Sequence, residues 1–135
     1  MTGYPLLLDL TGRPVLVVGG GPVALRRVRG LVQASAAVHV VAPLTAPELD
    51  GLGVRVSHRP YAEGDLLGCW LVHACTDDTA VNAAVARDAA AAGIFCVRAD
   101  AAEGGSASTP AVTRLDGLTV AVSAGGDPRR AVAVR

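Results

Sequence analysis

The 135-residue chain has no lysine, only 3% aromatic residues and three cysteines. Its twelve arginines balance twelve acidic residues, so its formal net charge is zero. Because the arginines are scattered and aromatic residues are scarce, we expect no binding to nucleic acid. Cys69, Cys75 and Cys96 are odd in number and form no C-x-x-C motif, so we expect no disulfide framework and no metal site. Each lies in or beside an apolar run, which predicts small thiols in the core.

Long hydrophobic runs are also missing, although 51% of the residues are hydrophobic. No segment approaches the roughly 18 apolar residues that a membrane-spanning helix needs. The first five residues include no basic stretch of the kind that begins a signal peptide. We therefore expect a soluble, cytoplasmic protein that does not associate with a membrane and is large enough to bury a sizeable core.

A glycine-rich turn between an apolar run and a helical pattern is the strongest local motif. The run 15–18 is short and β-branched, as a buried parallel strand should be. Gly19, Gly21 and Ala24 then fit the dinucleotide fingerprint G-x-G-x-x-G/A, in which the glycines allow a tight turn and a close approach to pyrophosphate. The start of a helix adds free N–H groups that favour phosphate. We expect dinucleotide contacts from Gly19, Gly20, Gly21, Pro22 and Val23; a glycine-rich turn without a ligand is the alternative.

Further strand and helix patterns alternate along the chain. Strands are predicted at 15–18, 38–41, 54–59, 69–74 and 94–97, and helices at 23–34 and 80–92. This order predicts an α/β fold of the Rossmann type, with a doubly wound parallel sheet. A β-hairpin with an Asp116-Gly117 turn and the start of a truncated helical region follow. We therefore expect a dinucleotide-binding domain over 1–110 and the start of a dimerisation region over 111–135. The apolar hairpin has no core of its own, which predicts a homodimer.

Four segments are expected to meet at the carboxyl ends of the strands, where such sheets bind ligands. Besides the glycine loop they contribute Pro43, Leu44, Thr76, Asp77 and Asp100. Pro43 and Leu44 would line the adenosine pocket through their backbone. No acidic or basic residue directly follows the second strand, so this position does not separate NAD from NADP. Asp77 suits either a helix cap or a nucleotide contact, and Asp100 suits either a turn cap or a chemical role.

The same motifs carry a resemblance to a known family. In order along the chain they are Tyr4-Pro5-Leu6, Val17 to Ala24, Val40 to Pro43, Ala74 to Asp78 with Val81-Asn82, Ile94-Phe95-Cys96 leading to Asp100, Thr109-Pro110-Ala111, and Val120 to Gly126. With this ordered set the chain resembles the N-terminal dehydrogenase part of siroheme synthases, the precorrin-2 dehydrogenase and sirohydrochlorin ferrochelatase family. The set extends over nearly the whole chain.

The resemblance implies a function. It implies NAD-dependent oxidation of precorrin-2 to sirohydrochlorin in a homodimer, and some members then insert ferrous iron to give siroheme. The important aspartate of the family corresponds to Asp100, which would accept a proton while a hydride leaves for the nicotinamide. Two other interpretations are a non-enzymatic NAD-binding regulatory module and a homologue that has lost its substrate half.

Overall fold

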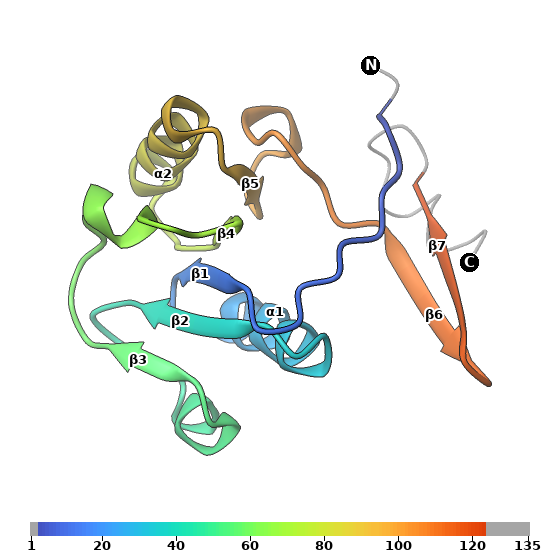
Figure 1. Ribbon diagram of the computed structural model, residues 1–135. Coiled ribbons are helices and arrows are strands. Elements are labelled where there is room, and N and C mark those ends of the chain that lie inside the picture. The colour runs from blue at the N-terminus through green and yellow to red at the C-terminus, as the bar shows by residue number, and fades with distance from the viewer. Residues whose placement is uncertain (1–2, 124–135) are drawn as a thin grey trace. The chain divides into compact units, whose positions relative to one another are not determined.

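The computed structural model describes residues 3–123 of the chain (Figure 1). By its internal contacts the chain divides into two units. The larger unit, Leu8–Ala107, contains a five-stranded sheet with its helices. The smaller unit contains the two termini and a two-stranded hairpin, with its described part limited to 3–7 and 108–123. The region 124–135, where the sequence predicts the start of a helix, lies outside the described residues.

The sheet of the larger unit is entirely parallel. Its strands are β1 (Pro14–Val18), β2 (Ala37–Val41), β3 (Arg55–Ser57), β4 (Leu71–Ala74) and β5 (Phe95–Arg98). They lie in the order β3-β2-β1-β4-β5, so the chain leaves β1 in one direction and later returns to its other side at β4. The carboxyl ends of β1 and β4 form the crevice at which such a sheet binds ligands. The predicted Rossmann-type fold is confirmed.

Two α-helices cover opposite faces of this sheet, α1 (Pro22–Gln33) and α2 (Thr79–Ala92) (Figure 1). The buried residues of α1 recur at helical spacing and pack with the odd-numbered positions of β1. They are Ala24, Leu25, Val28 and Leu31. On the other face, Val85 and Ala89 of α2 pack with the even-numbered positions. Every residue from Val15 to Val18 is at most 2% exposed, and each such side chain contributes about 1.5–3 kcal/mol by burial.

Short 3₁₀ helices complete the connections, η1 (Pro47–Leu52), η2 (Glu63–Leu66) and η3 (Ala102–Gly104). The sequence did not predict η1, because a six-residue turn is too short to show a helical period. It nevertheless buries Leu49 completely on the same face as α1. The predicted strand 54–59 is shorter in the structure because Arg59 N turns back and donates to Ser57 O at 3.1 Å. The strand expected at 69–74 begins only at Leu71, since Cys69 N donates to Leu66 O within a turn.

The smaller unit contains the predicted hairpin. Antiparallel strands β6 (Ala111–Leu115) and β7 (Leu118–Val122) are joined by Asp116 and Gly117, whose φ angles are 49° and 79°. Two successive residues with positive φ define the type I′ turn that an Asp-Gly pair favours. The hairpin presents apolar side chains, with Leu115 and Leu118 more than 60% exposed.

No helix in the range 3–123 is long and apolar enough to cross a bilayer.

The ends of α2 follow from local sequence. Asp78 is its N-cap, and the carboxylate accepts hydrogen bonds from Ala80 N at 2.9 Å and from Val81 N at 3.4 Å. Gly93 ends the helix at φ 71°, in the left-handed conformation that glycine adopts without strain. The predicted helix 80–92 is confirmed at its C-terminal end and begins one residue earlier than expected, at Thr79.

Replacing Asp78 with alanine should lower the free energy of unfolding by about 1 kcal/mol, because two N–H groups at the helix start lose their acceptor. Urea denaturation of the two proteins would measure this difference. Asp77→Ala is the matched control, since this exposed neighbour caps nothing and should leave the stability unchanged. Equal losses for both variants would contradict the assignment of the cap.

Candidate functional site

The loop between β1 and α1 is shaped by two close backbone contacts. At Gly19, where φ is 132°, an added Cβ would lie 2.6 Å from Cys75 O. At Gly20 an added Cβ would collide with Leu44 O, and Gly20 O accepts a hydrogen bond from Ala46 N at 2.7 Å. The first two glycines are therefore required by the loops that follow β4 and β2. Direct contact of Gly19 and Gly20 with a dinucleotide stays a prediction.

The third glycine faces open space instead. Nothing lies within 4 Å of a Cβ built on Gly21, and its φ of −89° is available to any residue. Helix α1 begins at Pro22, and its first i→i−4 hydrogen bond is donated by Leu25 N to Gly21 O. The preceding amide of Val23 thus lies in the first turn, where N–H groups have no intrahelical acceptor. Open space beside a helix N-terminus fits the pyrophosphate of a dinucleotide.

The loop after β2 lies beside the glycine loop at the same edge. Its backbone reaches Gly20 through Leu44 O, while the Leu44 side chain is 85% exposed. Residues 42–46 include no ionisable side chain. The structure therefore brings Pro43 and Leu44 to the expected edge, and no charge in this loop would attract or repel a 2′-phosphate.

The loop after β4 is held by a residue to which sequence reasoning assigned no role. Asn82 of α2 is fully buried. Its Oδ1 accepts from Thr76 N at 3.0 Å, and its Nδ2 donates to Thr76 O at 3.0 Å. The Thr76 hydroxyl also lies 2.7 Å from Asn82 Oδ1, so this side chain is already engaged within the protein. Asp77 is exposed beside it. An asparagine on the buried face of an alanine-rich helix was the available signal.

Asp100 follows β5, at the same edge. Both of its carboxylate oxygens accept hydrogen bonds from Arg98, Oδ1 from Nε and Oδ2 from Nη2, each at 3.0 Å. These bonds are the main reason that the pKa of Asp100 falls to about 2, and Asn82 contributes further. The carboxylate is therefore ionised at every physiological pH. Sequence reasoning also missed Arg98, although a charged residue at the end of a buried strand was visible.

A buried histidine lies one residue before the end of β4. His73 is only 4% exposed, and within residues 3–123 its Nδ1 has no hydrogen-bond partner. Burial, together with the nearby charge of Arg27, lowers its pKa to about 4. The imidazole is thus neutral at pH 7.

This histidine should make the fold sensitive to acid. Its pKa is about 6.5 when unfolded and about 4 when folded, so between these values the unfolded chain binds more protons. Stability should be constant above about pH 6.5 and fall as the pH drops towards 4, by about 3 kcal/mol. Urea denaturation at several pH values would measure this slope. His73→Ile should reduce this slope, leaving the part due to His39, whose pKa burial also lowers. His58→Gln, at an exposed position, is the control. An unchanged slope in His73→Ile would contradict this assignment.

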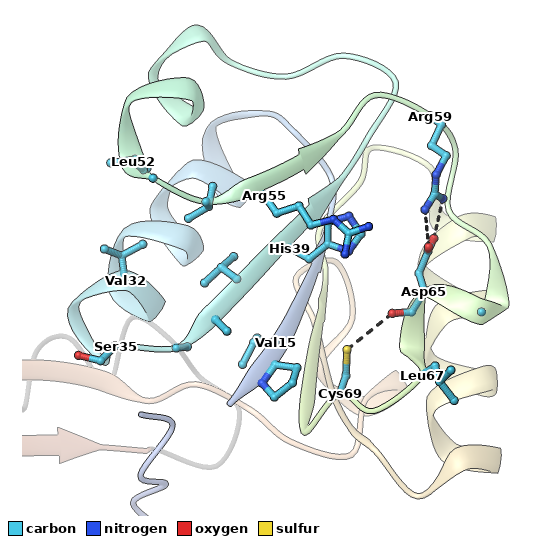
Figure 2. Close-up of a pocket in the computed structure, with 17 residues that line it drawn as sticks. Val15, Val32, Ser35, His39, Leu52, Arg55, Arg59, Asp65, Leu67 and Cys69 are labelled. Carbon is cyan, nitrogen blue, oxygen red and sulfur yellow. Dashed lines mark hydrogen bonds and ion pairs between the residues drawn. The ribbon is translucent and has the colours of Figure 1, made fainter. Parts of the chain in front are cut away.

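A separate groove lies beside β2 and β3 (Figure 2). Its volume is about 720 Å³, and its lining includes the first residues of β1, β2 and β3. Two of its lining residues, Arg59 and Asp65, form an ion pair at 2.6 Å, and a third, His39, has its Nε2 2.8 Å from Ser57 Oγ. None of the residues expected to contact the dinucleotide lines this groove, so we do not assign it to the coenzyme.

Comparison with known proteins agrees with this geometry. A family described as "Putative NAD(P)-binding" matches residues 6–111. The siroheme synthase of Azotobacter vinelandii is 45% identical over 131 residues, which are 94% of this chain and 28% of that protein. The siroheme synthase of Ectopseudomonas mendocina is 46% identical over 129 residues, with the same two coverages. This chain thus spans little more than a quarter of the length of these relatives.

A solved structure extends the comparison to the fold. SirC, a precorrin-2 dehydrogenase, superimposes with a TM-score of 0.83 and 34% sequence identity. The match covers 98% of this chain and 67% of that one. The resemblance inferred from the ordered motifs is therefore confirmed, and the chain belongs to the putative NAD(P)-binding family.

Proposed function

We propose that this chain uses NAD to oxidise precorrin-2 to sirohydrochlorin in siroheme biosynthesis. The observation that carries the proposal is one sheet edge that combines an open helix N-terminus at Gly21 with an ionised carboxylate at Asp100. The likeness to SirC and to the siroheme synthases supports the choice of substrate. The proposed oxidation uses both parts, a binding site for the coenzyme and a carboxylate that stabilises positive charge on the substrate.

The glycine loop and its neighbours would hold the coenzyme. When bound, NAD supplies the acceptor for a hydride. Gly21, Pro22 and Val23 would surround the pyrophosphate, with Gly19 and Gly20 shaping the turn. Pro43 and Leu44 would line the adenosine side through their backbone, and Thr76 and Asp77 would close the site from the loop after β4.

Asp100 would act on the substrate. Loss of a hydride leaves positive charge on the tetrapyrrole, and a fixed carboxylate stabilises such charge. The resulting cation is a strong acid, so it can give up a proton even to a carboxylate whose pKa is about 2. Asp100 would therefore serve first as an electrostatic partner and then as the proton acceptor.

Incubation of the protein with NAD and precorrin-2 tests this function directly. The sirohydrochlorin absorption spectrum and NADH should then appear together, in equal amounts. If NAD binds by calorimetry and no sirohydrochlorin forms, the chain is a non-enzymatic NAD-binding module or a homologue without its substrate half. Addition of ferrous iron to the same mixture would test whether iron is inserted as a second substrate.

We further propose that residues 1–110 bind the coenzyme and that residues 111–135 begin a dimerisation region. A homodimer should form through the hairpin, because the exposed side chains of Leu115 and Leu118 gain by burial against a second copy. Light scattering at tens of micromolar should give twice the chain mass of 13.6 kDa. Leu115→Ser combined with Leu118→Ser should weaken the dimer, with Leu67→Ser, also strongly exposed, as the control. A monomeric wild-type protein would contradict this proposal.

A further inference from the structure

Arg98 has no part in the function described above, although it touches the residue on which that function depends. We propose that Arg98 is a positioning residue, which holds the carboxylate of Asp100 in one orientation at the coenzyme edge. This inference rests on the function proposed for Asp100, and it adds a residue that neither the fingerprint nor the family motifs include.

The contact between the two side chains is made at two points. Nε and Nη2 of Arg98 each donate to a different oxygen of Asp100, both at 3.0 Å. A planar guanidinium that meets a carboxylate in this way fixes its plane as well as its position. A lysine would offer a single point charge in its place. The Arg98 side chain is only 11% exposed, so solvent competes little for its donors.

The loop around Gly104 leaves space for the Arg98 side chain. A Cβ on Gly104 would collide with Nη1 of Arg98 and lie 2.8 Å from its Cδ, so the glycine leaves room for the guanidinium. This loop is tied to β5 by a reciprocal pair of bonds. Cys96 N donates to Ser106 Oγ, and Ser106 N donates to Cys96 O, each at 2.9 Å. The loop at Gly104 therefore restricts where the Arg98 side chain can lie.

Within the part of the chain that the structure describes, Arg98 is the one cation that acts on this carboxylate. Among residues 3–123, the groups that act on the pKa of Asp100 are Arg98, the amide side chain of Asn82 and backbone. The other titratable group that acts on Arg98 is the thiol of Cys96, whose own pKa is raised by burial. Asp100 thus interacts with a single cation among these residues, and removal of that cation should return its pKa towards the ordinary value and release its orientation.

Nuclear magnetic resonance of the protein without coenzyme or substrate tests the pair itself. Between pH 7 and 3 the carboxyl carbon of Asp100 should hardly titrate in the wild type, whereas in Arg98→Met it should titrate towards the ordinary value of 3.8. At pH 7 the guanidinium nitrogens of Arg98 should give resolved, slowly exchanging signals that are lost in Asp100→Asn. Arg87→Met, at an exposed position of α2, is the matched control. An ordinary pKa of Asp100 in the wild type, or an unchanged one in Arg98→Met, would overturn the proposal.

Turnover then tests positioning. Arg98→Met should lower kcat about 10–100-fold with an unchanged KM for NAD, because a misplaced carboxylate costs rate rather than coenzyme binding. Arg98→Lys should recover part of this loss. Gly104→Ala, which crowds the guanidinium without a change of charge, should lower kcat more mildly. A shifted pKa with unchanged kcat would overturn the positioning role and leave the proposed function intact. Absence of wild-type turnover would instead refute the function, with the NMR titration still deciding the ion pair.

Discussion

Replacement of Asp100 with asparagine should lower the turnover of precorrin-2 by about 10²–10⁴-fold, the usual worth of a positioned proton acceptor. Asparagine keeps the size of the side chain and one acceptor oxygen, so Arg98 retains one of its two hydrogen bonds. The negative charge that stabilises the oxidised substrate is lost, together with the site for the proton. NAD affinity should change little, because the pyrophosphate would bind at Gly21, in a different segment of the edge.

Two measurements separate chemistry from structure. In folded Asp100→Asn, steady-state turnover should fall, whereas the NAD affinity measured by calorimetry should not change. Asp50→Asn, which replaces an exposed residue of η1, should change neither turnover nor affinity. Asp100→Ala should lose turnover as Asp100→Asn does. If Asp100 is only a turn cap, that variant should instead lose about 1 kcal/mol of stability. Wild-type turnover in folded Asp100→Asn would leave the proposed mechanism without its carboxylate.

Replacement of Gly21 with valine should weaken NAD binding on the order of 100-fold, about 2.7 kcal/mol. The fold should tolerate the change, since the φ of Gly21 is negative and its Cβ would meet nothing within 4 Å. The branched side chain would instead fill the space in which the pyrophosphate has to approach the helix start. Calorimetric titration with NAD would measure the loss.

Substitutions at two other glycines, Gly20 and Gly30, serve as comparisons for Gly21→Val. Gly20→Val should destabilise the protein itself, because the added Cβ would collide with Leu44 O. Gly30→Ala, in the middle of α1, should leave NAD affinity unchanged and raise stability by about 1 kcal/mol. Unchanged NAD affinity in folded Gly21→Val would place the dinucleotide elsewhere.

The elements themselves could be predicted because their signals are local. The side chains of the apolar run before Gly19 are buried on both faces of β1, and four consecutive residues are enough to show this pattern. The Asp116-Gly117 pair requires no partner to form its turn, and Asp78 and Gly93 end α2 through contacts with their own helix. The alternation of these elements was enough to predict a doubly wound sheet, because crossovers between parallel strands have one favoured hand.

The site was only partly predictable, since its decisive contacts join residues far apart in sequence. A glycine motif does not tell that Gly20 is required by Leu44 while Gly21 is open to a ligand. In the sequence Asn82 is a single polar residue in an alanine-rich helix, and its hydrogen bonds to Thr76 form only in the folded protein.

Asp100 was predicted as an aspartate at the end of a strand, but the orientation of its carboxylate depends on where Arg98 points. That direction is decided by the approach of the loop at Gly104. Local sequence therefore determined which elements form and which sheet edge is expected to bind the coenzyme. Tertiary packing decided which glycine is free, which side chains are held and how the carboxylate of Asp100 is oriented, because close approach of distant segments exists only once the strands are assembled.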